Sequence, residues 1–202
     1  MTLIGVVKPS FRPRSLGVRQ RIESVVRLGS CPERALSDVV ELVRDHLTIA
    51  AACHGSWIRP EGFAEHVLAH AALERRGFIG RLATLHSADL YLALAAAMDI
   101  PDAVARLEEL HIRPIVELVS RVHGGAPYAA EIQKRVRSTL LHATPRTRLR
   151  DYSGRSSLRD WMRVHAVREL RDARKASERS LVTSPSRTGD RSPDLPASTA
   201  PL

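Results

Sequence analysis

The amino-acid sequence predicts an all-α fold. Apolar residues recur at intervals of three and four over several long segments, which is the period of an α-helix. No segment sustains the alternation of apolar and polar residues that is typical of a β-strand. Pro and Gly residues fall between the periodic segments, where helices begin and end. We therefore expect a helical bundle preceded by a helical N-terminal extension.

The first helices follow a stretch without periodicity. Residues 1–31 carry no long helical pattern, so we predict a loose N-terminal arm there. One helix is expected from about Pro32 and a second from about Pro60, because proline suits the first turn of a helix. Ser87 is a suitable N-cap for a third helix over residues 88–98, whose run of Ala and Leu predicts burial on most sides.

A further helix is expected to open at Pro101 and to end at Gly124. Its period places Leu107 and Leu110 on the inner side. Pro114 is expected to kink or split this helix, because proline lacks the backbone N–H that the helix needs.

The remaining helices lie in the second half of the chain. Residues 128–142 are predicted to form an amphipathic helix, because apolar residues recur there at four-residue intervals: Tyr128, Ile132, Val136 and Leu140. After a basic loop, Ser157 and Asp160 match a capping box that opens a last helix, expected to run to about Lys175. Residues 177–202 are rich in Ser, Pro and Thr, so we predict a disordered tail.

The formal net charge of +9 lies in a single segment. Residues 134–179 carry 14 basic and 5 acidic residues, whereas the residues on each side sum to zero. Such asymmetry suggests a polyanionic partner, with nucleic acid first and an anionic membrane second. Basic residues of the loop and of the outer side of the last helix form a band: Arg146, Arg148, Arg150, Arg155, Arg163, Arg168, Arg171, Arg174 and Lys175. Such a band attracts phosphates and loses affinity as salt rises.

Two aromatic residues accompany this band. Tyr152 lies in the basic loop and is predicted to stack on an unpaired base, since aromatic rings are the usual platforms for such bases. Trp161 shares the apolar side of the last helix with Leu158 and Met162, so we expect it to anchor the helix on the core.

The sequence does not indicate a membrane protein, a secreted protein or an enzyme. The longest apolar stretch is far shorter than the roughly 20 residues that span a bilayer, and the start does not match a signal peptide. With only two cysteines, a reducing compartment is the default, and we expect a cytoplasmic protein with no membrane partner. No phosphate-binding loop or nucleophile elbow is present, so we expect no enzyme, no catalytic residue and no cofactor.

A metal site is an alternative that the histidines raise. His66 and His70 have the i, i+4 spacing of a two-histidine site on a helix. Val67 stands where the HExxH pattern has its glutamate, and nine histidines supply such a pair by chance, so the prediction is no metal.

The segment from Tyr152 to Lys175 resembles the second conserved region of bacterial sigma-70 family factors, especially the extracytoplasmic-function group. The matching residues are Gly154, Ser157, Leu158, Trp161, Ala166, Asp172 and Lys175. Upstream, residues 88–93 are similar to the start of the family's first helix pair, and Glu131 begins a motif like its E-hydrophobic-x-Q. The resemblance covers about residues 86–176. It implies a region 2 domain there, with residues 32–85 as the helical extension.

The resemblance implies binding to the β′ clamp helices of RNA polymerase core and to the non-template strand of the −10 promoter element. The polymerase contacts are expected on the 128–142 helix at Glu131, Gln133, Lys134, Arg135 and Arg137. The bases are expected to meet Tyr152, Arg155, Ser156 and Arg159, and the strand's backbone to meet Arg163, Arg168, Arg171 and Lys175. The resemblance also implies an anti-sigma-type regulator as a further partner.

Three departures from the family pattern support an alternative. Lys134 stands where the family has Gln, and Arg168 stands where it has Asn. The 26 residues after Ala176 are too few for the second DNA-binding domain of a full factor. The alternative is a truncated sigma-like protein that acts as an interaction or competitor module without promoter recognition. Membrane-surface binding by the last helix is less well supported, because core packing is the simpler use of its apolar side.

Overall fold

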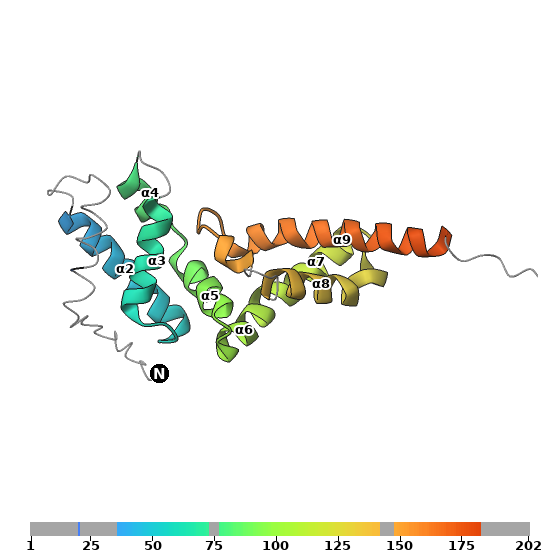
Figure 1. Cartoon of the computed structure of the whole chain (residues 1–202), viewed down its shortest axis with the longest axis horizontal. Helices are drawn as coiled ribbons and strands as arrows, with labels where there is room; N and C mark the ends of the chain where they lie inside the picture. Colours follow the sequence, from blue (N-terminus) through green and yellow to red (C-terminus); the bar gives the residue numbers. More distant parts are fainter. Residues whose placement is uncertain (1–19, 21–35, 73–76, 142–147, 183–202) are drawn as a thin grey trace, which may run out of the picture.

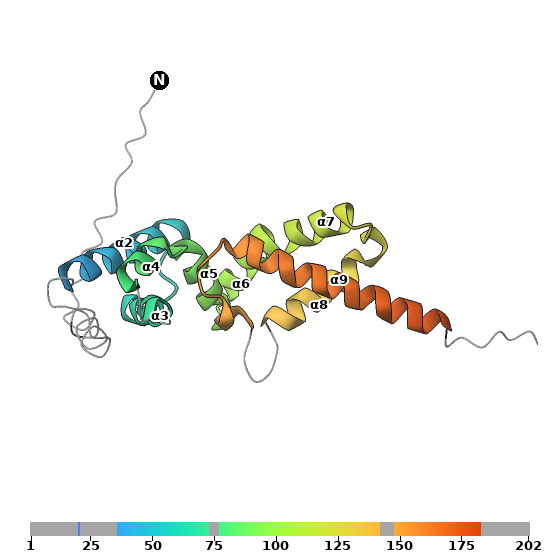
Figure 2. The ribbon, with the colours of Figure 1, turned by 90° about the horizontal axis from the view of Figure 1, so that it is seen from above.

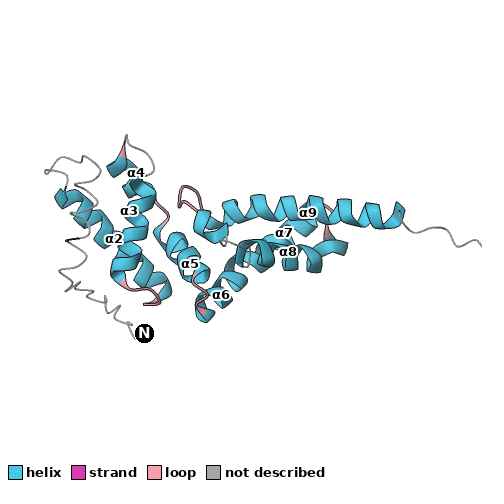
Figure 3. Ribbon diagram, viewed as in Figure 1, coloured by secondary structure: helices cyan, strands magenta, loops and turns pink. Residues whose placement is uncertain are grey.

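The all-α fold is confirmed by the structure, a computed structural model that describes residues 20, 36–72, 77–141 and 148–182. Within these ranges the chain forms helices joined by short connections, with no β-strand (Figure 3). None of the helices described is long and apolar enough to cross a membrane. Apart from Gln20, the predicted arm over residues 1–31 lies outside the described residues, and so does Arg146 of the predicted basic band.

The helices form an elongated molecule (Figure 1). At one end lie α2 (Leu36–His54), α3 (Pro60–Ala72) and α4 (Phe78–Thr84). The central pair is α5 (Ser87–Ala97) and α6 (Pro101–Leu107). At the other end, α9 (Leu158–Val182) lies over α7 (Arg113–Val122) and α8 (Ala129–Leu141), as Figures 1 and 2 both show. The described ranges also contain the π-helical turn η2 (Glu108–Ile112) and the 3₁₀ turns η3 (Ala126–Tyr128) and η4 (Arg148–Asp151).

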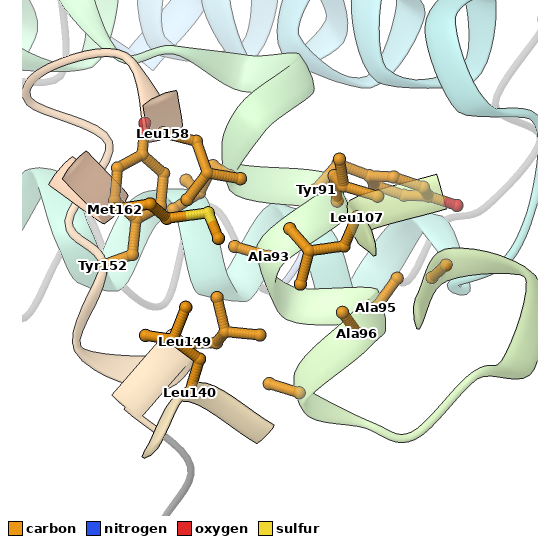
Figure 4. Packing of buried hydrophobic residues seen from close by; sticks show 14 of the residues in the cluster. Tyr91, Ala93, Ala95, Ala96, Leu107, Leu140, Leu149, Tyr152, Leu158 and Met162 are labelled. Carbon is orange, nitrogen blue, oxygen red and sulfur yellow. The ribbon is translucent and has the colours of Figure 1, made fainter. Parts of the chain in front are cut away.

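Helix α5 lies at the centre of the core, and its predicted burial on most sides is confirmed. It packs against α2 on one side and against α6 on the other. The hydroxyl of Tyr91 fastens the connection between α2 and α3, because it accepts the Ile58 N–H at 2.8 Å and donates to the Gly55 carbonyl at 3.2 Å. One continuous cluster of buried apolar residues runs from α2 to α9, and Figure 4 shows its central part.

Ser87 is not the N-cap that the sequence predicted. Helix α5 begins at Ser87, and His86 occupies the N-cap position without a side-chain cap. The Ser87 hydroxyl instead bonds to Nδ1 of the buried His46, whose Nε2–H donates to the Leu82 carbonyl at 2.7 Å. A partner on a distant helix therefore competes for the hydroxyl, which local sequence does not reveal. Helix α4, which follows Gly77, was also not predicted.

The helix predicted from Pro101 is split, as Pro114 suggested. Proline has no N–H to donate to the carbonyl four residues before it, and the wider π turn η2 precedes it directly. A π turn adds a residue to the helical repeat, which moves side chains off the face that a regular α-helix predicts. Leu110 is accordingly 41% exposed, so its predicted inward position is wrong, whereas Leu107 is fully buried.

The last helix is longer than predicted. It runs to Val182 rather than to about Lys175, so the disordered tail predicted from residue 177 is wrong for residues 177–182. The residues from Arg174 to Arg179 are mostly good helix formers, and the Ser, Pro and Thr content of the whole tail obscured them. Residues 183–202 lie outside the described part of the chain.

Candidate nucleic-acid interface

The apolar side of α9 anchors the helix on the bundle. Its buried residues are Leu158, Met162, Ala166, Leu170 and Ala173. Ser157 is confirmed as an N-cap, since the Asp160 N–H donates to Ser157 Oγ at 3.1 Å. The reciprocal bond of a capping box is not formed, because Asp160 Oδ2 accepts the Ser157 hydroxyl at 2.7 Å and not the Ser157 backbone N–H. A second cap comes from α5, where Asp89 Oδ2 accepts the Leu158 N–H at 2.8 Å. The start of α9 is thus held from two directions.

Basic side chains cover the opposite side of α9 and the turn η4. Seven of them are exposed and form no ion pair with any residue that the structure describes: Arg148, Arg150, Arg159, Arg163, Arg168, Arg171 and Lys175. We call these seven residues the basic surface. The ion pairs found in the described residues lie elsewhere, on α6, α7 and α8. Unpaired guanidinium groups are available to phosphate oxygens, with which they form charge-assisted hydrogen bonds.

The basic surface follows the length of α9. Arg168, Arg171 and Lys175 recur at i, i+3 and i+7 and therefore share one stripe, whereas Arg159 and Arg163 form a second pair at i and i+4. At 1.5 Å of rise per residue, the span from Arg159 to Lys175 is about 24 Å.

Two acidic side chains of α9 accept hydrogen bonds from hydroxyl groups. Glu169 Oε1 accepts a hydrogen bond from Thr139 of α8 at 3.0 Å, and Asp160 accepts that of Ser157. Asp172 is exposed beside Arg168 and Arg171.

Arg174 does not belong to the basic surface, although the sequence placed it in the outward band. It is half-buried, and its guanidinium donates to the carbonyl of His123 at the end of α7. Basic side chains often bond the last carbonyls of a helix in this way. Arg174 therefore joins α9 to α7.

Tyr152 is buried, so the prediction that its ring stacks on an unpaired base is wrong. Only 1% of the residue is exposed, and its hydroxyl donates to the Ser156 carbonyl. Burial raises the pKa of this phenol above its usual value. Figure 4 shows Tyr152 packed near Leu158 and Met162. A loop position suggested exposure, but the loop folds back so that this ring fills the core.

Trp161 is confirmed as a core anchor. It is half-buried, packs against the core, and has Tyr152 at a centroid distance of 5.6 Å and His165 at 4.3 Å. The remaining residues predicted to meet bases, Arg155, Ser156 and Arg159, are exposed around the start of α9.

Gly154 lets this loop approach α5 closely. Its φ of +69° is a conformation that L side chains rarely adopt, and a Cβ at this position would lie 3.3 Å from Leu85 Cδ2. Its carbonyl accepts the His86 N–H at 3.0 Å. The segment just before α5 therefore positions the loop between η4 and α9.

Helix α8 presents a different set of charges. Lys134 and Arg137 are exposed, and Glu131 forms an ion pair with Arg135 at 2.7 Å. Gln133 is turned inward, where its amide donates to Oε1 of the buried Glu108 at 2.6 Å. Its side chain is thus bonded to η2 and does not lie with the exposed charges of α8. The wider π turn, which sequence patterns do not reveal, places Glu108 opposite α8.

The histidine pair of α3 is in contact but gathers no further ligands. The rings of His66 and His70 meet edge to face at a centroid distance of 4.4 Å. Burial, assisted by His70 and Arg150, lowers the pKa of His66 to about 4. Among the described residues, no group of three or more His, Cys, Asp or Glu is arranged to hold a metal ion.

Comparisons with protein-family models, with curated proteins and with solved structures each find no match for this chain.

Proposed function

We propose that the protein is a sigma-like transcription initiation protein, with α8 binding RNA polymerase core and the basic surface holding the non-template strand of the −10 promoter element. The observation that carries this proposal is the basic surface itself. Its seven residues are exposed and unpaired within the described chain, although acidic residues lie on the same helix. A protein surface of this kind is best explained by an external polyanion.

The proposed polymerase contact rests on the exposed side of α8. Glu131, Lys134, Arg135 and Arg137 share this side, and the ion pair between Glu131 and Arg135 fixes two of them. Because Gln133 faces Glu108, the contact is proposed for these four residues alone.

The experiment is co-elution of the full chain with RNA polymerase core at about 50 mM salt, where phosphate contacts are strong. The eluted pair is then offered a single-stranded −10 oligonucleotide and a scrambled one. We expect co-elution and tighter binding of the −10 strand. Failure to co-elute would refute the polymerase assignment.

Two charge variants separate the two surfaces. Lys134→Glu with Arg137→Glu should abolish co-elution, whereas Arg168→Ala with Arg171→Ala should preserve co-elution and weaken oligonucleotide binding. Arg44→Ala on α2 is the matched control, since it removes an exposed arginine at the other end of the molecule. It should change neither result.

A second candidate function is favoured by the burial of Tyr152. Without this ring on the surface, the domain has one base-stacking group fewer, and a sigma-like competitor that occupies polymerase without reading a promoter becomes the alternative. The competitor would co-elute with core, bind −10 and scrambled strands equally, and reduce initiation by a standard sigma factor in a transcription assay.

A further inference from the structure

We propose that, in the absence of polymerase, the basic surface binds closed double-stranded DNA through its phosphates, in preference to a single strand and without regard to base sequence. This inference rests on the proposed function for its surface but names a different ligand state: the duplex that precedes strand opening. It follows from the extent of the charges along α9 and from the burial of the aromatic residues around them.

The arrangement of the charges suits a duplex. Five residues of the basic surface lie on one continuous helix, spaced over about 24 Å of its axis: Arg159, Arg163, Arg168, Arg171 and Lys175. Duplex DNA carries one charge per about 1.7 Å of axis, so a basic surface of this extent faces a dense array of phosphates. A single strand has a lower charge density and releases fewer counterions per contact, about 0.7 rather than 0.9. Phosphate contacts from these side chains therefore favour the duplex.

The aromatic residues of the described chain supply no exposed ring that would favour a single strand over the duplex. Proteins that favour single strands supply exposed rings on which bases stack. None of the aromatic residues in the described ranges is exposed. The two rings nearest the basic surface are Tyr152, which is buried, and Trp161, which is packed against Tyr152 and His165. Phosphate contacts alone carry no sequence information.

Fluorescence anisotropy on the full chain without polymerase tests the inference. The probes are two 20-bp duplexes of unrelated sequence and their separate strands, at 50 and 200 mM salt. We expect the two duplexes to bind equally and more tightly than any single strand by at least about threefold. If about six phosphates are contacted, affinity for the duplex should fall about 10³-fold between the two salt concentrations.

Matched variants locate the site. Arg168→Ala and Arg171→Ala should each weaken binding to both duplexes equally and reduce the slope of log affinity against log salt by about 1. Arg44→Ala should leave both quantities unchanged.

The outcomes distinguish this inference from the proposed function. Tighter binding of a single strand, or a tenfold or larger preference between the two duplexes, would overturn the inference and leave the polymerase and −10 proposal standing. Duplex binding without polymerase co-elution would support the inference and refute the proposed function. Absence of binding to every probe at 50 mM salt would refute the basic surface as a nucleic-acid site altogether.

Discussion

Replacing Gly154 by alanine tests whether the loop between η4 and α9 is held in place by its close contacts with Leu85 and with Leu90 of α5. Two effects of the substitution are expected to lower the free energy of unfolding. The φ of +69° is costly for a residue with a Cβ, by about 1–2 kcal/mol. The new Cβ would also lie 3.3 Å from Leu85 Cδ2, and crowding of this kind in a packed core costs roughly 1–3 kcal/mol. Lower entropy of the unfolded chain offsets about 0.4–1 kcal/mol. We expect a net loss of about 1–5 kcal/mol.

Two other glycines provide matched controls for the separate effects. Gly55 has a φ of +77° but nothing within 4 Å of its would-be Cβ, so Gly55→Ala should cost only about 1 kcal/mol. Gly80 lies inside α4 with neither a positive φ nor a neighbour within 4 Å. Gly80→Ala should therefore stabilise the protein by about 0.5–1 kcal/mol.

Urea unfolding monitored by circular dichroism measures all three variants. In a thermal scan, each kcal/mol corresponds to about 2–4 °C for a chain of this size. If Gly154→Ala costs no more than Gly55→Ala, the loop is not packed against Leu85. If it costs nothing, the observed backbone conformation of the loop is itself refuted.

Three further predictions concern single side chains. His66 has a folded-state pKa of about 4, below its usual 6.5, so the unfolded chain binds more protons between these values. Stability should fall by up to about 3 kcal/mol as pH drops from 7 to 4, and urea unfolding of His66→Gln should show a smaller drop. Asp89→Asn weakens the cap on Leu158 and should cost about 1–2 kcal/mol in thermal unfolding; an unchanged melting temperature would contradict that role. Asp172→Asn removes an exposed acid beside the basic surface, so it should leave stability within about 0.5 kcal/mol and tighten duplex binding up to about fivefold in anisotropy. Weaker binding by this variant would contradict the proposed phosphate contacts.

The predictions that the structure confirms concern residues whose positions depend on neighbours close in sequence. The N-cap role of Ser157 and the anchoring role of Trp161 were predicted from spacing alone, because each depends on neighbours within one or two turns of the same helix. The outward position of Arg163, Arg168 and Arg171 was predicted for the same reason.

Ser87, Gln133, Tyr152 and Arg174 differ from prediction for a common reason. Each side chain is held by an atom far away in sequence or by a loop that folds back onto the core. A hydroxyl, amide or guanidinium group can bond equally well to solvent, to its own helix or to another element, and its residue type does not select among them.

For this protein, the sequence by itself determined the all-α class, most helix boundaries and the position of the positive charge, because helical period and charge are properties of neighbouring residues. Only the tertiary structure decided which side chains of the basic loop and of α9 remain on the surface. Tyr152 is buried and Arg174 is bonded to α7, whereas seven basic residues stay exposed. The physical reason is that burial depends on the packing of helices distant in the chain, which the pattern of neighbouring residues does not contain.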